Sequence, residues 1–152
     1  MITKPLCVIL DDEEIALDSL RENIEELNLL EIERAFLDPN DLLDDIDTLQ
    51  SQIFFLDIEM GITGIEIAKE LKNKSIIFVS GHNEYISDVV DIKPVAFVQK
   101  PIKKHKLKKA IELAVHNLKF NKSIILCIFL VLQHIKMNFG YCFWMCVYLS
   151  YI

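Results

Sequence analysis

Acidic residues are absent from the last 30 residues of the chain, 123–152, where Lys136 is the only formal charge. The whole chain of 152 residues has 16 basic and 23 acidic residues. All of these charged residues except Lys136 lie in residues 1–122. That segment therefore has 15 basic and 23 acidic residues and a net charge of −8. This break predicts an acidic domain over residues 1–120 and an apolar tail over 121–152. The acidic balance argues against nonspecific nucleic-acid binding, so we expect no direct contact with nucleic acid.

Two further absences concern targeting and metal chemistry. The N-terminal residues 1–5 run directly into an apolar segment and lack the pattern of a secretory signal. The four cysteines lack the closely paired ligands of a zinc site; they are Cys7, Cys127, Cys142 and Cys146. We therefore expect reduced thiols and a cytoplasmic protein.

Residues 6–118 alternate between short apolar runs and helical periodicities. Five runs rich in branched or aromatic residues predict buried strands at residues 6–10, 30–36, 53–56, 76–79 and 96–98. Helical spacing joins Ile15, Leu17, Leu20, Ile24 and Leu27 in the first predicted helix. In the last predicted helix it joins Leu107, Ile111, Ala114, Val115 and Leu118, while residues 84–91 are weakly helical. Such tandem units predict a doubly wound α/β fold, with helices on both faces of a parallel sheet.

Polar residues follow the predicted strands at their carboxyl ends. Asp11 and Asp12 follow the first strand, and Asp57, Ser80 and Lys100 follow or end later ones. In open parallel sheets this edge forms the ligand site, so these side chains should converge. Crowded carboxylates either hold protons or bind a cation, and oxygen-only ligands favour Mg²⁺. Because carboxylates can accept phosphoryl groups, the set predicts an acyl-phosphate switch on Asp57.

Each motif alone has a simpler interpretation. Asp11 and Asp12 could be charges at a helix N-terminus, Ser80 a loop residue, Lys100 a surface lysine and Phe97 a core residue. Four motifs in order at strand ends are more specific, and they are residues 10–13, 55–58, 78–81 and 97–101. Together they resemble the receiver domain of bacterial two-component response regulators, over about residues 4–118. The resemblance implies a flavodoxin-like (CheY-like) three-layer α/β/α sandwich with strand order 2-1-3-4-5.

The resemblance also implies roles for the matching residues. Asp57 would accept the phosphoryl group from a sensor histidine kinase, and Lys100 would pair with the phosphate beside a cis bond to Pro101. Ser80 and Phe97 would move inward as the activation switch. Such a protein is a signalling phosphoprotein with only slow self-phosphorylation and self-dephosphorylation, so it is not an enzyme in the usual sense.

A Mg²⁺ cofactor is part of the same implied site. Its ligands would be the side chains of Asp11, Asp12 and Asp57 and the backbone carbonyl of Glu59. Glu59 and His82 occupy positions that affect the dephosphorylation rate in this family.

The sequence departs from the family pattern in the loop after Asp57. Residues 60–64 lack the usual proline and are one residue short. This leaves open a receiver-like interaction module that no longer takes phosphate. A Mg²⁺-dependent phosphohydrolase is a weaker alternative, because Asp11 and Asp12 lack the spacing of a haloacid-dehalogenase motif and the chain has no room for a cap.

The tail is the second departure. Residues 1–120 resemble receivers that precede a LytTR-type DNA-binding domain, but the tail does not resemble that domain. Its two apolar blocks, residues 123–135 and 139–152, are each shorter than the ~20 residues that span a bilayer. Three interpretations stay open: a truncated or frame-shifted remnant, an interaction segment such as a homodimer surface, and a membrane-associated segment.

Overall fold

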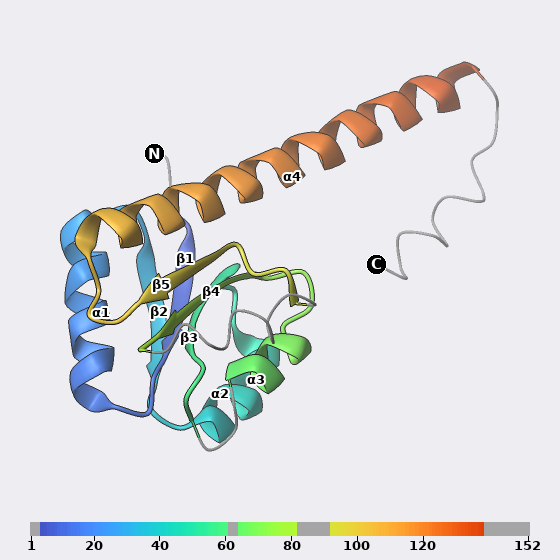
Figure 1. Ribbon diagram of the computed structural model, residues 1–152. Coiled ribbons are helices and arrows are strands. Elements are labelled where there is room, and N and C mark those ends of the chain that lie inside the picture. Colours follow the sequence, from blue (N-terminus) through green and yellow to red (C-terminus); the bar gives the residue numbers. More distant parts are fainter. Residues whose placement is uncertain (1–3, 61–63, 82–91, 139–152) are drawn as a thin grey trace. The chain divides into compact units, whose positions relative to one another are not determined.

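The computed structural model describes residues 4–60, 64–81 and 92–138 of the chain. The five strands are β1 (Leu6–Leu10), β2 (Glu31–Phe36), β3 (Ile53–Asp57), β4 (Ser75–Ser80) and β5 (Ala96–Gln99). The helices are α1 (Glu14–Leu27), α2 (Pro39–Asp45), the short 3₁₀ helix η1 (Ile46–Thr48), α3 (Gly64–Glu70) and α4 (Lys104–Asn138) (Figure 1). The weakly helical stretch predicted at residues 84–91 lies outside the described residues.

All five strands are parallel, in the order β2-β1-β3-β4-β5. This order confirms the predicted doubly wound topology. The strands end together: Leu10 pairs with Leu56, Asp57 with Val79 and Ser80 with Gln99. The register therefore brings the polar residues that follow these strands to one edge of the sheet.

Two separate cores cover the two faces of the sheet. α1 and the first part of α4 pack on one face through Leu20, Ile24 and Ile111. α2 and α3 pack on the other face through Leu42 and Ile67. β3 is buried along its whole length, and its residues alternate between the two cores. The arrangement is the expected three-layer α/β/α sandwich.

Local sequence signals explain where the first helices begin and end. Asp38 caps α2 by accepting a hydrogen bond from the Asn40 backbone N–H at 2.8 Å, and Pro39 follows in the first turn. α1 ends at Asn28, whose φ of 55° is the left-handed conformation that asparagine tolerates.

One member of the predicted apolar stripe of α1 was misplaced. Leu17, Leu20 and Ile24 are buried as predicted, but Ile15 is 88% exposed. Ile15 lies two residues before Leu17, which is more than half a turn around the helix, so both cannot face the core. The exposed Ile15 side chain lies near the functional site, in the lining of a hollow that also includes Lys100.

The last helix is longer than the predicted one. Apolar spacing predicted a helix over residues 107–118, whereas α4 continues to Asn138. Residues 119–138 contain neither glycine nor proline, so no strong breaker stops the helix at the compositional break. Packing divides the chain into two units, residues 1–118 and 119–152. None of the helices among the described residues combines the length and the apolar character needed to span a membrane.

Candidate functional site

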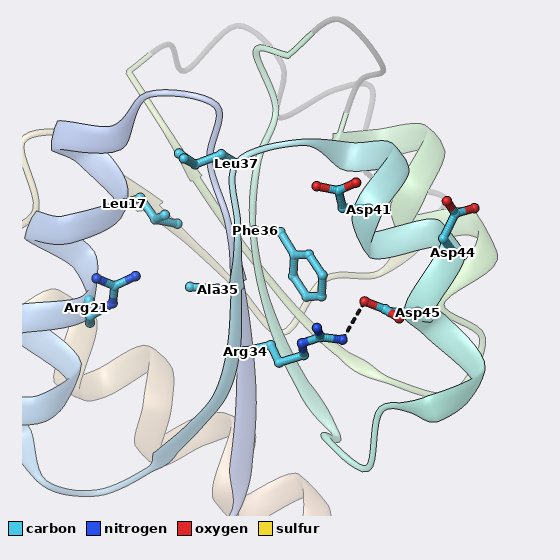
Figure 2. A pocket seen from close by; sticks show the side chains of 9 residues that line it. All are labelled: Leu17, Arg21, Arg34, Ala35, Phe36, Leu37, Asp41, Asp44 and Asp45. Atoms are coloured by element: carbon cyan, nitrogen blue, oxygen red, sulfur yellow. Dashed lines mark hydrogen bonds and ion pairs between the residues drawn. The ribbon is translucent and has the colours of Figure 1, made fainter.

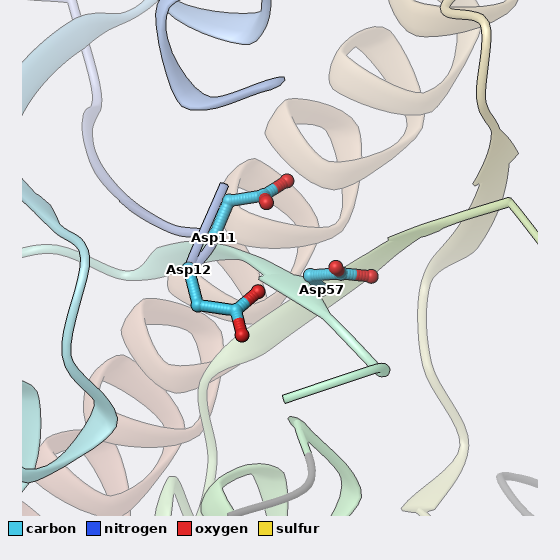
Figure 3. Close-up of side chains that lie close together, drawn as sticks. All are labelled: Asp11, Asp12 and Asp57. Carbon is cyan, nitrogen blue, oxygen red and sulfur yellow. The ribbon is translucent and has the colours of Figure 1, made fainter. Parts of the chain in front are cut away.

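Three carboxylates gather where β1 and β3 end. Asp11 and Asp12 follow β1 directly, and Asp57 is the last residue of β3. Each offers an oxygen within 4.8 Å of the others (Figure 3). Asp11 and Asp57 are only 1% and 4% exposed, whereas Asp12 is exposed. The cluster thus has two buried carboxylates and one at the solvent boundary.

Lys100 connects the two buried carboxylates. Its Nζ lies 2.7 Å from Asp11 Oδ2 and 3.1 Å from Asp57 Oδ2. The Lys100–Pro101 peptide bond is cis, as the resemblance implies. Burial alone would lower the pKa of Lys100, but the two carboxylates outweigh it and raise that pKa above its ordinary value. Lys100 therefore stays cationic at neutral pH and offsets part of the buried negative charge.

Backbone N–H groups hold the other oxygen of each buried carboxylate. Asp57 Oδ1 accepts hydrogen bonds from the N–H of Ile58 at 2.7 Å and of Glu59 at 3.4 Å. Asp11 Oδ1 accepts from the Glu13 N–H at 3.1 Å. Burial raises the pKa of Asp11 above its ordinary value, although Lys100 opposes the shift. The buried charge at Asp11 is thus only partly compensated by the protein itself.

The donor set fits a hard divalent cation. All three side chains present oxygen, their geometry is compact, and one of them faces solvent, where water can complete a coordination shell. Buried carboxylates that one lysine compensates incompletely also favour an added positive charge. The residues present therefore fit Mg²⁺.

The predicted switch residues lie next to this cluster in the sheet. Ser80 ends β4 and is fully buried, and Phe97 on β5 is half-buried and packs against the α2–α3 core. Phe97 pairs with Phe78, two residues before Ser80. Glu59 is exposed, and its Oε2 lies 3.9 Å from where a Cβ would stand on Gly81. His82 lies outside the described residues.

Gly64 is a site residue whose function the sequence analysis missed. A Cβ at Gly64 would lie 1.9 Å from the Asp57 carbonyl oxygen, so only glycine fits there. The Gly64 N–H also donates to the Ile58 carbonyl oxygen at 3.4 Å. The start of α3 is thereby held directly against the backbone of Asp57. A glycine just before a helical periodicity signals such a close approach, but it does not identify the partner.

A hollow of about 660 Å³ adjoins the cluster. The start of α1, including Glu14 and Ile15, forms one wall, and Lys100, Pro101 and Ile102 form the other. Because Lys100 belongs to both, a molecule seated in the hollow would lie beside the carboxylates. Ile15 gives this surface an exposed apolar side chain, which the helical spacing alone assigned to the core.

A second hollow, of about 580 Å³, flanks β2 between α1 and α2 (Figure 2). Its arginines already have carboxylate partners: Arg34 pairs with Asp45, and Arg21 with Asp18. Arg34 also lies over the Phe36 ring. The hollow contains none of the carboxylates of the cluster.

Comparison with known proteins agrees with the fold. The family model of the response regulator receiver domain matches residues 7–112. An uncharacterized response regulatory protein of Yersinia pestis is 32% identical over 108 residues, which are 68% of this chain and 45% of that protein. The positive alginate biosynthesis regulatory protein of Pseudomonas aeruginosa is 27% identical over 113 residues, 70% of this chain and 46% of the relative. The chain thus spans less than half the length of these relatives.

Solved receiver domains have the same architecture. The signal receiver domain of a modulated diguanylate cyclase from Desulfovibrio desulfuricans matches with a TM-score of 0.69 and 25% identity, over 78% of this chain and 98% of that one. The isolated receiver domain of RcsB from Salmonella enterica serovar Typhimurium, with the phosphomimetic BeF₃⁻, matches with a TM-score of 0.66 and 25% identity, over 72% of this chain and 87% of that one. The chain belongs to the response regulator receiver domain family of two-component systems.

Proposed function

We propose that this protein is a phosphorylation-activated switch in which Asp57 accepts a phosphoryl group from a sensor histidine kinase. The observation that supports the proposal most directly is the salt bridge between Lys100 and Asp57, next to two further carboxylates. Asp57 is buried, accepts hydrogen bonds from two backbone N–H groups and contacts Lys100, whose positive charge would also attract an incoming phosphoryl group. Phosphoryl transfer depends mainly on such positioning and charge neutralisation.

The proposed reaction transfers a phosphoryl group from a phosphohistidine to Asp57. A carboxylate oxygen of Asp57 attacks the phosphorus of a phosphohistidine, the P–N bond breaks, and its electron pair stays on the imidazole nitrogen. An acyl phosphate forms on Asp57. Lys100 then pairs with a phosphoryl oxygen, and the Ser80 hydroxyl donates to another.

Asp11, Asp12 and Asp57, with the Glu59 backbone carbonyl, would hold Mg²⁺. When bound, the ion neutralises charge on the phosphoryl oxygens during transfer. Lys100, which contacts both Asp11 and Asp57, would share the compensation of these carboxylates with the ion.

The switch itself needs two states of unequal affinity for the phosphoryl group. On phosphorylation the Ser80 hydroxyl would gain a hydrogen bond to a phosphoryl oxygen, which favours its movement toward Asp57. Phe97 is half-buried at the neighbouring strand, so it can turn inward into space that Ser80 leaves. The new contact at the phosphoryl group would thus shift Ser80 and Phe97 from their inactive to their active positions.

The kinase would dock on the hollow beside Lys100. Ile15 and Ile102 offer apolar contacts within reach of the cluster, and Glu13 and Glu14 give this surface a negative rim. A phosphohistidine presented by a helix could enter over Lys100. Glu59 and His82 would then set how long the acyl phosphate survives.

The proposal is tested by labelling with acetyl phosphate and by the response to beryllofluoride, each with and without Mg²⁺. Intact-mass analysis should show one phosphoryl group per chain, only with Mg²⁺ and not in Asp57→Asn. Asp44→Asn changes an exposed aspartate on α2 that is not part of the cluster, and it serves as the matched control. A folded protein that takes no phosphate and ignores beryllofluoride would instead be a receiver-like interaction module.

A further inference from the structure

The exposed apolar residues of the chain concentrate in α4 after residue 118. Phe120 is 59% exposed and Ile125 is 67% exposed. Exposed residues in the same stretch are Ile124, Leu126, Ile128 and Phe129. This surface lies within the second packing unit, residues 119–152, and outside both cores of the sheet. Contiguous apolar surface of this kind marks a place of interaction.

The charge of this unit has one sign. Residues 119–152 contain Lys119, Lys122 and Lys136 and no acidic residue, which gives +3. Residues 1–118 contain the other 13 basic and all 23 acidic residues, which gives −10. Lys119 and Lys122 are exposed. The apolar stretch therefore begins with cationic side chains in a chain that is otherwise acidic.

Over residues 119–124, the helix separates these two kinds of side chain. Phe120, Ile124 and Ile128 follow one another at four-residue intervals, so they share one face. At 3.6 residues per turn, Lys119 and Lys122 lie on roughly the opposite side of the helix. Lysines on one side and large apolar residues on the other are typical of helices that lie in a membrane interface. Beyond Ser123 the exposed apolar residues continue around the helix.

We propose that residues 119–129 of α4 form a docking site for the surface of an anionic lipid bilayer. Phe120, Ile124 and Ile128 would enter the boundary between headgroups and acyl chains, while Lys119 and Lys122 would stay with the lipid phosphates. The charge favours this occupant over a second copy paired through the same stretch, because that pairing would bring together two units that each carry a charge of +3. The proposal does not depend on whether Asp57 takes phosphate.

Co-sedimentation of the full chain with vesicles tests this proposal. The vesicles are phosphatidylcholine alone, or phosphatidylcholine with one third phosphatidylglycerol. We expect binding to the anionic vesicles that weakens at high salt, and little binding to the neutral ones.

Two double variants make the test specific. Lys119→Glu with Lys122→Glu should lower the partition coefficient on anionic vesicles about 10-fold or more. Lys69→Glu with Lys72→Glu makes the same change of net charge at exposed positions in the other packing unit and should leave vesicle binding nearly unchanged. Equal losses in both variants would assign the effect to net charge and overturn the proposed site.

The remaining outcomes also decide the matter. Equal binding to neutral and anionic vesicles would overturn the anionic surface as the occupant. No vesicle binding, together with a dimer by light scattering and cross-linking through the exposed Cys127, would assign the face to a second copy instead. Cys7 is buried, so Cys142→Ser and Cys146→Ser confine that cross-link to Cys127.

Discussion

Among single residues, Lys100 has a central role, because its positive charge is shared by the two buried carboxylates. It contacts both Asp11 and Asp57, and removing one partner of a buried ion pair leaves the other charge uncompensated. Lys100→Met should therefore lower the free energy of unfolding by about 1–3 kcal/mol without metal. Saturating Mg²⁺ should restore much of that loss, because the ion would compensate the same carboxylates.

Urea unfolding with and without Mg²⁺ measures this effect. Lys104→Met is the matched control, since Lys104 pairs with Glu26 at an exposed position, and such pairs contribute less than about 1 kcal/mol. A loss in Lys100→Met that Mg²⁺ does not reduce would contradict the shared-counterion account.

Asp11 gives the site a dependence on pH. Its pKa is raised by burial, so the folded protein binds this proton more readily than the unfolded chain. Stability from this group is therefore present at low pH and falls as pH rises from the ordinary aspartate range through the raised pKa. At neutral pH without metal, Asp11→Asn should raise the free energy of unfolding by about 1 kcal/mol.

Unfolding curves at neutral and acid pH check the sign. The advantage of Asp11→Asn should shrink as pH falls through the raised pKa, because the wild-type carboxyl then becomes neutral too. An advantage that grows toward acid pH would refute the assignment of the burial cost to Asp11.

Gly64 is the residue with the tightest backbone constraint near the site. A Cβ there would meet the Asp57 carbonyl oxygen at 1.9 Å, so Gly64→Ala must move the backbone that carries the phosphoacceptor. We expect a loss of about 1–3 kcal/mol in stability and a lower phosphorylation rate. Thermal unfolding and acetyl phosphate labelling measure both.

Gly81→Ala is the control for that variant. The nearest atom to its added Cβ is the Glu59 side chain at 3.9 Å, which is ordinary contact. Similar damage from both alanines would mean that the close approach at Gly64 has no special role.

At the scale of elements, the sequence predicted where the strands end more reliably than it predicted which side of a helix is buried. The apolar runs before Asp57, Ser80 and Lys100 predicted strands whose polar ends share one edge of the sheet, because parallel strands in register must end together. Sequence spacing did not reveal that Lys100 reaches Asp11 as well as Asp57, since that depends on side-chain position. It also assigned Ile15 to the core, because five apolar residues at irregular spacing fit a helical stripe too easily.

The first turn of α1 should be specific for the protein donor. Ile15→Ser removes an 88% exposed side chain from the rim of the hollow next to Lys100. We expect several-fold slower transfer from a phosphorylated kinase histidine domain and unchanged labelling by acetyl phosphate, which needs no docking surface. The two initial rates measure the difference.

Leu37→Ser is the matched control, because Leu37 is 45% exposed and lines the hollow between α1 and α2. Equal slowing by Leu37→Ser, or equal slowing with both donors in Ile15→Ser, would exclude a docking role for this turn.

At the scale of the whole molecule, composition separates two regions. Among the described residues, the acidic part up to residue 118 contains the five-stranded sheet, and the cationic part after it continues α4. The compositional break was visible in the sequence, but the continuation of the helix across it was not predicted. A change in charge indicates a change in interaction partners, whereas helix ends are indicated by residues that break or cap a helix. The domain boundary near residue 120 stays a prediction.

The central claim concerns Asp57 as the phosphoacceptor. The most direct measurement is intact-mass analysis of the full chain after incubation with acetyl phosphate and Mg²⁺, beside Asp57→Asn and the Asp44→Asn control. The account predicts one Mg²⁺-dependent phosphoryl adduct in the wild type and in Asp44→Asn, and none in Asp57→Asn. An adduct that persists in folded Asp57→Asn, or a folded wild type that takes none, would contradict it.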